Sequence, residues 1–345
     1  MQKLLSIIIS NRNDTTMLSV TIRSCIESFR PLGIENCEIV IVDNSDKEYK
    51  PLLNSVIPAG YIKDGTIQLH HQPFPCLFTA RDLAAEKSKG KYILCLDSHM
   101  ICGHNMVYDL VQFAESMSSD STFGFAHAPI NWAHQHHSRS RHDRDMTKHE
   151  LGPWGNVYTE PKTITWKGMP WLCRRNFFLS RVNGIGGYGA LSQHKLSWGG
   201  GDMHIGIKPW LLGFKNYAVP TSPGIHIGPF PKIDQIPGEP HSVIVGKSAT
   251  MDKYRLYSAS GNGPHTLGFL VSCYVLGGEP MMERNKHMLK ERFGRYLNAE
   301  SHWTQAIGYG KDEKAWLDEN KKMTFEQLTT TKPWNQQCQS PTIVT

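Results

Sequence analysis

The sequence predicts an α/β fold, in which a mostly parallel sheet is flanked by helices and followed by a helical C-terminal extension. Through the first hundred residues, short apolar runs rich in β-forming residues alternate with segments of helical periodicity, which is the pattern of a parallel sheet. Three of these runs end in a polar or carboxylate side chain. After residue 265 the segments with a regular pattern are all helical. Together these observations indicate one nucleotide-binding type of sheet with added helices.

The order strand, helix, strand, strand, helix, strand predicts βαβ connections and therefore parallel strands. Asp14 or Thr15 is the expected N-cap of the first helix, and Gly90 is the expected C-cap of the second. Strands are expected at 4–9, 37–42, 67–71, 91–96 and 123–129, and helices at 16–29, 78–89, 205–212, 266–275, 280–297, 313–320 and 325–330.

The fourth predicted strand ends in Asp97-Ser98-His99, two side chains able to bind a metal with one residue between them. The first two strands end at Asn11 and Asp43. Because the carboxyl ends of parallel strands meet at one edge of a sheet, where ligands bind in open α/β folds, we expect these residues to lie together. They predict a site for a nucleotide and a divalent cation. Each residue alone has a plainer interpretation, Asp97 as a helix cap and Asp43 as a turn residue.

Length and composition fit a large α/β enzyme. The 345 residues carry a net charge of +6 and 17 histidines, which is compatible with a polyanionic partner but does not require one. Eight scattered cysteines without a C-x-x-C motif predict reduced thiols and a cytoplasmic location. No apolar run approaches the ~20 residues that span a bilayer, so no membrane insertion is expected. Expected domains are 1–228, with a nucleotide half at 1–105 and an acceptor half at 106–228, and then a lid loop and helices at 229–345.

Two common nucleotide-binding motifs are missing. No G-x-G-x-x-G follows the first strand, which argues against a dinucleotide-dependent dehydrogenase, and no G-x-x-x-x-G-K-[ST] indicates a P-loop. A nucleotidyltransferase of the cytidylyltransferase kind would need a glycine-rich, basic first loop, which Asn11-Arg12-Asn13 does not provide.

A longer pattern surrounds the Asp-x-His pair. It consists of Arg81, Ala85, Ser88, Gly90, Ile93, Leu96, Asp97 and His99. This spacing resembles that of GT-A glycosyltransferases of the broad family 2 type, and is especially similar to the polypeptide N-acetylgalactosaminyltransferases. The resemblance covers about residues 4–228 and implies a Rossmann-like GT-A fold. It also implies that Asp43 contacts the uracil or ribose of a UDP-sugar, and that Arg81 faces the nucleotide or its phosphates. A solvated helix position is the plainer interpretation of Arg81.

A second signature follows at Trp198-Gly199-Gly200-Gly201-Asp202. It resembles the Trp-Gly-Gly-Glu motif that opens a helix beneath the donor sugar in GT-A enzymes, although Gly201 stands where the family usually has Glu. Asp202 would bind sugar or act as a general base, or else cap the helix. A base would give inversion at the anomeric carbon, whereas the most similar enzymes are retaining, so the stereochemistry stays open.

His226, within Gly-Ile-His-Ile-Gly, resembles the family's third metal ligand. The resemblance therefore implies that Asp97, His99 and His226 hold Mn²⁺ or Mg²⁺; taken alone, His226 is typical of a core histidine. The family's diphosphate-binding Arg is missing after it. Weak candidates for that role are Lys232, His241 and Lys247.

The segment 131–150 is rich in histidine and in basic residues and is expected to be a solvated loop, with a loop that faces the acceptor as the alternative. The residues expected to contact a nucleic acid are Trp132, Arg139, Arg141, Arg144 and Lys148. The expected acceptor is the 5-hydroxymethyl group of a modified pyrimidine in DNA, by likeness to the base J glucosyltransferase and its bacteriophage relatives. Alternatives are a protein or polysaccharide acceptor, or an inactive nucleic-acid-binding module with a transferase fold.

Overall fold

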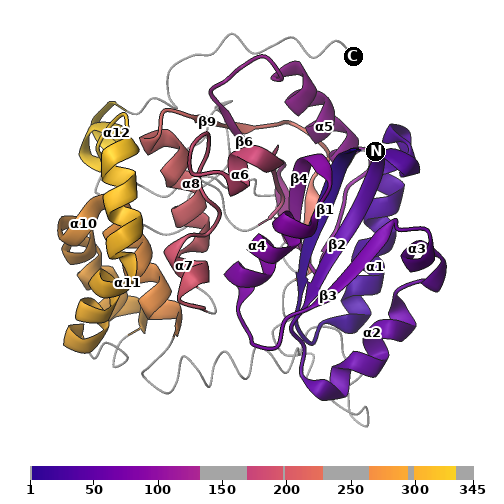
Figure 1. The fold of residues 1–345 in the computed structure, drawn as a ribbon, viewed down its shortest axis with the longest axis horizontal. Coiled ribbons are helices and arrows are strands. Elements are labelled where there is room, and N and C mark those ends of the chain that lie inside the picture. Colours follow the sequence, from indigo (N-terminus) through magenta and orange to yellow (C-terminus); the bar gives the residue numbers. More distant parts are fainter. Residues whose placement is uncertain (1, 133–168, 197–198, 228–263, 294–298, 332–345) are drawn as a thin grey trace.

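The computed structural model describes residues 2–132, 169–196, 199–227, 264–293 and 299–331. At its centre lies a seven-stranded sheet of order β3-β2-β1-β4-β8-β6-β9, with helices on both sides (Figure 1). Its strands are β1 (Lys3–Asn11), β2 (Cys37–Asp43), β3 (Ile67–His71), β4 (Gly90–Asp97), β6 (Phe123–His127), β8 (Trp171–Arg174) and β9 (Lys215–Ala218).

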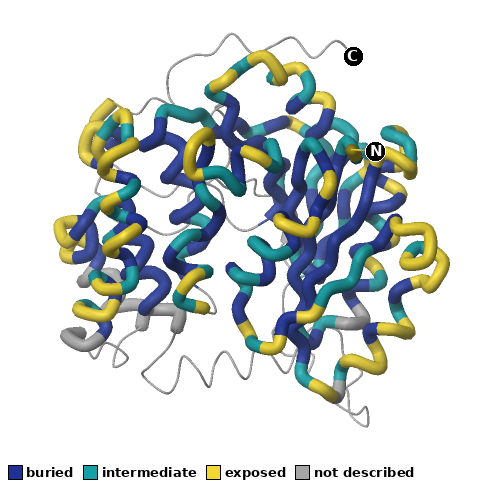
Figure 2. Tube along the Cα trace, viewed as in Figure 1, coloured by how far each residue is buried: buried dark blue, intermediate teal, exposed yellow. Residues whose placement is uncertain are grey.

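Strands β3, β2, β1 and β4 are parallel, as the sequence predicts. The apolar side chains of β1, β2 and β4 are buried on both faces, because helices cover each side of a parallel sheet. Figure 2 shows these strands as the buried centre of this half of the sheet. The predicted α/β fold class is therefore confirmed for this part of the chain.

The other half of the sheet begins with β8, which pairs antiparallel with both β4 and β6. A second sheet has three strands in the order β5-β10-β7. These strands are short, and the apolar patterns of the sequence do not reveal them. They are β5 (Met100–Ile101), β7 (Ile130–Trp132) and β10 (Gly224–His226).

The helices of the sheet region follow the predicted positions for α1 and α4. The short helices between β2 and β3, and α5, were not predicted. The bounds are α1 (Thr15–Phe29), α2 (Lys50–Val56), α3 (Ala59–Lys63), α4 (Leu77–Lys87), α5 (Met106–Ser116), α6 (Arg175–Leu179), α7 (Ala190–Gln193) and α8 (Gly201–Leu211), with 3₁₀ turns at Arg30–Leu32, Ile34–Asn36 and Lys47–Tyr49.

The predicted C-cap at Gly90 is wrong. Helix α4 ends with Ser88 as its C-cap, and Gly90 is the first residue of β4. A Cβ at position 90 would lie 2.5 Å from the backbone nitrogen of Ser6, so the glycine allows β4 to begin close against β1.

Three C-terminal helices form a layer beside α7 and α8, away from the sheet (Figure 1). They are α10 (Pro264–Phe293), α11 (Ala299–Asn320) and α12 (Phe325–Thr331). Gly278 breaks α10 between the two predicted helices, with φ of 70°. Helix α11 begins fourteen residues before the predicted start, Glu313 (313 − 299 = 14). In the part of the chain that the structure describes, no helix is long and apolar enough to cross a membrane.

Candidate metal and nucleotide site

The ends of three neighbouring strands bring Asn11, Asp43 and Asp97 to one edge of the sheet. Asn11 is paired with Asp43 across β1 and β2, and Ser10 is paired with Asp97 across β1 and β4. This is the common edge that the strand order predicts.

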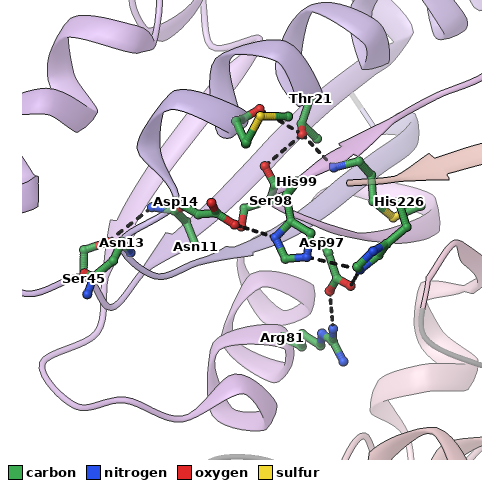
Figure 3. A network of polar contacts seen from close by, with 12 residues as sticks. Asn11, Asn13, Asp14, Thr21, Ser45, Arg81, Asp97, Ser98, His99 and His226 are labelled. Atoms are coloured by element: carbon green, nitrogen blue, oxygen red, sulfur yellow. Dashed lines mark hydrogen bonds and ion pairs between the residues drawn. The ribbon is translucent and has the colours of Figure 1, made fainter. Parts of the chain in front are cut away.

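His226 reaches the same edge from a distant part of the sequence. Strand β10 pairs antiparallel with β5, so that His226 lies opposite Met100, directly after the Asp-x-His pair. The Nε2 atoms of His99 and His226 are 3.1 Å apart, and His226 Nε2 is 3.4 Å from Asp97 Oδ2. The ligand atoms of the three residues lie within 4.8 Å of one another (Figure 3). One carboxylate oxygen and two imidazole nitrogens suit a divalent cation such as Mn²⁺.

The charges around this cluster favour an anionic Asp97. Burial alone would raise its pKa, but the hydrogen bond from His226 and the charges of Arg81 and His99 outweigh it and lower the pKa of Asp97. Burial lowers the pKa of His226, despite its contact with Asp97. For His99 burial acts in the same direction, but the hydrogen bond and charge of Asp14 prevail and raise its pKa. A neutral His226 beside a carboxylate is in the protonation state of a metal ligand.

Asp14 orients His99. Its Oδ2 accepts a short hydrogen bond from His99 Nδ1 and a second from Ser98 Oγ at 3.2 Å. That bond fixes the ring so that Nε2 faces His226 and Asp97 (Figure 3). Asp14 does occupy the N-cap position of α1, but its side chain makes no capping hydrogen bond. Asp14 would therefore orient His99 in the way that carboxylates commonly orient histidine ligands of a metal.

Hydroxyl groups on one face of α1 hold the turn that carries His99. Thr21 Oγ1 donates to the carbonyl of Ser98 at 2.8 Å and accepts from the backbone nitrogen of Met100 at 3.0 Å. Ser24 Oγ accepts from the backbone nitrogen of Cys102 at 3.1 Å. The turn after β4 is thus fixed by buried hydrogen bonds to a helix rather than by its own residues.

Arg81 is buried on α4 and not solvated. Its Nη2 donates to Asp97 Oδ1 at 2.7 Å, and its Nη1 donates to the hydroxyl of Tyr188 at 3.0 Å. Burial alone would lower the pKa of Arg81, but Tyr188, Cys95 and the carboxylates of Asp97 and Asp202 outweigh it and raise the pKa. The guanidinium is permanently charged beside the candidate metal site, and its Nε has no hydrogen-bond partner among the described residues.

At the ends of β1 and β2 the site contains a carboxylate oxygen and an amide oxygen that accept no hydrogen bond from the described residues. Asp43 Oδ1 accepts from Asn11 Nδ2 at 2.8 Å and from Ser45 Oγ at 2.6 Å. Asp43 Oδ2 and Asn11 Oδ1 are buried without a hydrogen-bond partner among the described residues, and His71 Nδ1 lies 3.5 Å from that Oδ2. Since buried acceptors are rarely left unsatisfied, a ligand with N–H or O–H donors, such as a pyrimidine base or a ribose, fits this end.

Asp202 lies in the first turn of α8, and Gly199 and Gly200 precede it with φ of 105° and 74°. A Cβ at Gly201 would overlap the ring of Phe78, so the side chain that the family usually has at this position finds no room. Asp202 is close enough for its charge to raise the pKa of Arg81. The helix N-terminus and Arg81 both favour its anionic form.

Several predicted contacts lie outside the described residues. They are Trp198, Arg139, Arg141, Arg144, Lys148, Lys232, His241 and Lys247. The backbone of Trp132 ends β7, but its side chain is likewise outside the description.

Comparison with known proteins agrees with the architecture. Residues 6–169 match the sequence profile of Glycosyl transferase family 2. The match covers less than half of the chain, and it supports a glycosyltransferase. The chain also resembles the crystal structure of GalNAc-T7 with UDP, GalNAc and Mn²⁺, with a TM-score of 0.58 and 19% identity over 96% of this chain. It spans 58% of the length of GalNAc-T7. At that identity the likeness shows the GT-A fold, which confirms the predicted fold class.

A second similar structure is that of S. aureus TarS, with a TM-score of 0.47 and 10% identity over 90% of this chain and 49% of TarS. No curated protein matches the sequence.

Three residues of the site escape the sequence patterns: Asp14, Ser45 and Tyr188. Asp14 resembles an ordinary helix cap, and Ser45 belongs to the turn after β2. Tyr188 lies in a glycine-rich segment whose φ values, including 62° at Gly187 and 49° at Gly189, indicate a tightly folded loop. The repeated glycines were the available signal, because such loops allow a backbone to approach other groups closely.

Proposed function

We propose that this protein is a metal-dependent glycosyltransferase that moves a sugar from a UDP-sugar to a hydroxyl acceptor. The observation that carries the proposal is the meeting of Asp97, His99 and His226 beside the buried Arg81. This cluster lies at the sheet edge where Asp43 presents a buried oxygen that accepts no hydrogen bond from the part of the chain that the structure describes. The family match at 6–169 supports the reaction class. A similar structure that contains UDP, GalNAc and Mn²⁺ supports the donor and the cation.

The nucleoside would bind at the ends of β1 and β2. Asp43 Oδ2 and Asn11 Oδ1 would accept its N–H or O–H groups, and Ser45 and Asn11 hold the Asp43 carboxylate in place. This arrangement uses two buried acceptors that receive no hydrogen bond from the described residues.

The diphosphate would lie beside the metal ligands and Arg81, which are in contact with each other through Asp97. Asp97, His99 and His226 would hold Mn²⁺ or Mg²⁺, which supplies the positive charge that stabilises a departing diphosphate. Arg81 keeps the Asp97 carboxylate in position with one nitrogen, and its charge contributes to the attraction of the phosphates.

The sugar and acceptor would bind at the start of α8. Gly199 and Gly200 let the backbone turn sharply there, and Asp202 is placed at the helix N-terminus close to Arg81. Asp202 either accepts the proton of the acceptor hydroxyl or binds the donor sugar, and we propose Trp198 as a second contact. The anomeric configuration of the product distinguishes these two roles, because inversion requires a base and Asp202 is the candidate for that base.

For the acceptor we propose the 5-hydroxymethyl group of a modified pyrimidine in DNA. The support is the net charge of +6 and the basic segment that contains Arg139, Arg141, Arg144 and Lys148. Basic side chains on a loop would contact phosphates, and the base would have to be flipped out of the helix to reach the donor.

The acceptor is tested by transfer of radiolabelled sugar from a panel of UDP-sugars to four acceptors: hydroxymethylated duplex DNA, unmodified duplex DNA, a peptide mixture and a polysaccharide. Label in hydroxymethylated DNA alone supports the proposal. Label in peptide or polysaccharide assigns the acceptor to that class instead. A variant with Arg139, Arg141 and Arg144 changed to Ala should lose transfer to DNA and keep hydrolysis of the donor.

A further inference from the structure

A second buried ionic cluster joins the C-terminal helices to the helix that carries Asp202. Glu313 on α11 is 2% exposed, and its Oε1 accepts from Lys208 Nζ at 2.6 Å and from His204 Nε2 at 3.0 Å. Lys208 and His204 both lie on α8 and are fully buried. Figure 1 shows α8 and α7 between the C-terminal helices and the sheet.

Glu313 and Lys208 also hydrogen-bond to the backbone at the start of α7 and in the loop before it. Glu313 Oε2 accepts from the backbone nitrogen of Ala190 at 2.6 Å. Lys208 Nζ donates to the carbonyls of Ile185 and Gly187, each at 3.1 Å. With Glu313 as its third acceptor, the ammonium group has used all three of its donors.

In this cluster Glu313 is a carboxylate and His204 is a neutral imidazole. Burial alone would raise the pKa of Glu313, but His204 and Lys208 outweigh it and lower the pKa. Burial lowers the pKa of His204 despite the nearby carboxylate. A neutral His204 donates through Nε2–H, which agrees with its buried Nδ1 having no hydrogen-bond partner among the described residues.

The loop is held from its other side by Asp82 of α4. Asp82 Oδ1 accepts from the backbone nitrogen of Tyr188 at 3.1 Å. A Cβ at Gly187 would lie 2.7 Å from that oxygen, and a Cβ at Gly189 would overlap the carboxylate of Glu313. Both glycines have positive φ. The glycines on either side of Tyr188 therefore allow the carboxyl groups of Asp82 and Glu313 to approach the loop closely and hydrogen-bond to its backbone.

The hydroxyl of Tyr188 accepts from Arg81 Nη1, and Arg81 Nη2 donates to Asp97. We infer that Glu313 is a positioning residue for the donor site: through Lys208 and Ala190 it fixes Tyr188, which holds Arg81 on Asp97. The inference rests on the proposed function. It makes α11 part of the catalytic unit, although α11 lies beyond residue 169, where the family match ends.

A purely stabilising role would not need this chemistry. Apolar side chains of similar volume commonly stabilise a core as well as a buried ion pair does. Apolar side chains, however, cannot bind the carbonyls of Ile185 and Gly187 or the amide of Ala190. The ionic groups therefore specify the position of one loop, and the loop carries the hydroxyl that contacts Arg81.

The inference is tested with Glu313→Gln, Tyr188→Phe and the double variant. Asp318→Asn is the matched control, because Asp318 is an exposed carboxylate on the same helix, paired with Lys314 at 2.8 Å. Amide hydrogen exchange is measured on the metal-free protein, and the affinity for Mn²⁺ in the presence of UDP is measured by electron paramagnetic resonance. If Glu313→Gln does not fold, the paired substitution Glu313→Leu with Lys208→Met replaces it, since it leaves no unpaired buried charge.

In Glu313→Gln we expect faster exchange at the amides of Ala190 and Tyr188 and little change in α5. In Asp318→Asn we expect exchange at these amides to match that of the wild type. Mn²⁺ affinity should fall by about 2- to 30-fold, the range for residues coupled to a site through a network. The loss in the double variant should be less than the product of the single losses, because both substitutions break one route. Exchange that rises uniformly, or losses that simply multiply, would overturn the inference.

A wild-type protein that binds no Mn²⁺ with UDP would contradict the proposed function instead. The exchange measurements need no ligand, so they still decide the inference: unchanged exchange at Tyr188 in Glu313→Gln would overturn it, and faster exchange there would support it.

Discussion

Asp14 provides a direct test of how the metal ligands are oriented. Its carboxylate is the hydrogen-bond partner of His99 Nδ1, and its side chain makes no capping bond to α1. Asp14→Ala should therefore weaken the metal site with little loss of helix stability. Removal of a group that orients a metal ligand typically costs 10- to 100-fold in metal affinity, which is about 1.4–2.7 kcal/mol at 25 °C.

The assay is a titration of the metal-free protein with Mn²⁺, followed by electron paramagnetic resonance, with thermal unfolding measured on the same samples. Ser98→Ala is the matched control, because Ser98 Oγ donates to the same carboxylate at 3.2 Å but is not a metal ligand. Asp14→Asn should be intermediate, since an amide oxygen can still accept from His99 without the negative charge. Unchanged Mn²⁺ affinity in Asp14→Ala, with the fold intact, would refute the assigned role.

Three further predictions concern stability and thiol chemistry. Burial lowers the pKa of His127 to about 3, well below the ~6.5 of an unfolded histidine, so acidification protonates the unfolded state first and stability is lost as the pH falls below ~6.5. Denaturant unfolding should show a loss of ~2 kcal/mol in the free energy of unfolding from pH 7 to 5. His127→Asn should remove that part of the pH dependence, and an equal pH dependence in the wild type and the variant would contradict the assignment. Gly201→Ala should destabilise by ~1–3 kcal/mol through overlap with Phe78, and Phe78→Leu in the same chain should recover part of it in thermal unfolding; purely additive losses would count against the overlap. The seven cysteines that the structure describes are buried and form no disulfide with one another, so a thiol reagent followed by mass spectrometry should label them only on unfolding. A native disulfide between Cys25 and Cys102, whose sulfurs are 3.7 Å apart, would contradict this.

The parallel half of the sheet was predictable because its strands are continuous apolar runs with a polar residue at the end. The run before Asp97 and the run before Asp43 each correspond to a strand, and their order along the chain determines the shared edge. The third candidate metal ligand, His226, could be suggested only by family resemblance. Its contact with His99 joins residues 127 positions apart, and it depends on a three-residue strand, β10, with no pattern of its own.

The residues that orient the site were not predictable, because their side chains serve contacts that no local pattern encodes. Asp14 resembles a cap until the fold brings His99 to it, 85 positions later. Family resemblance placed Arg81 near the nucleotide, but no local pattern predicted its burial or its contacts with Asp97 and Tyr188. Glu313 looks like one of many charged residues on a polar helix, but it meets Lys208 only after α11 packs beside α7 and α10 packs against α8.

The central claim is that Asp97, His99 and His226 form the metal centre of a glycosyltransferase. The most direct test is the release of UDP from a panel of UDP-sugars by protein stripped of metal with a chelator, with and without added Mn²⁺, in wild type and in Asp97→Ala. We predict release by the wild type only with Mn²⁺, for at least one donor, and none by Asp97→Ala at equal folded content. UDP release that persists without metal, or in Asp97→Ala, would contradict the metal centre, and no release from any donor would contradict the activity itself.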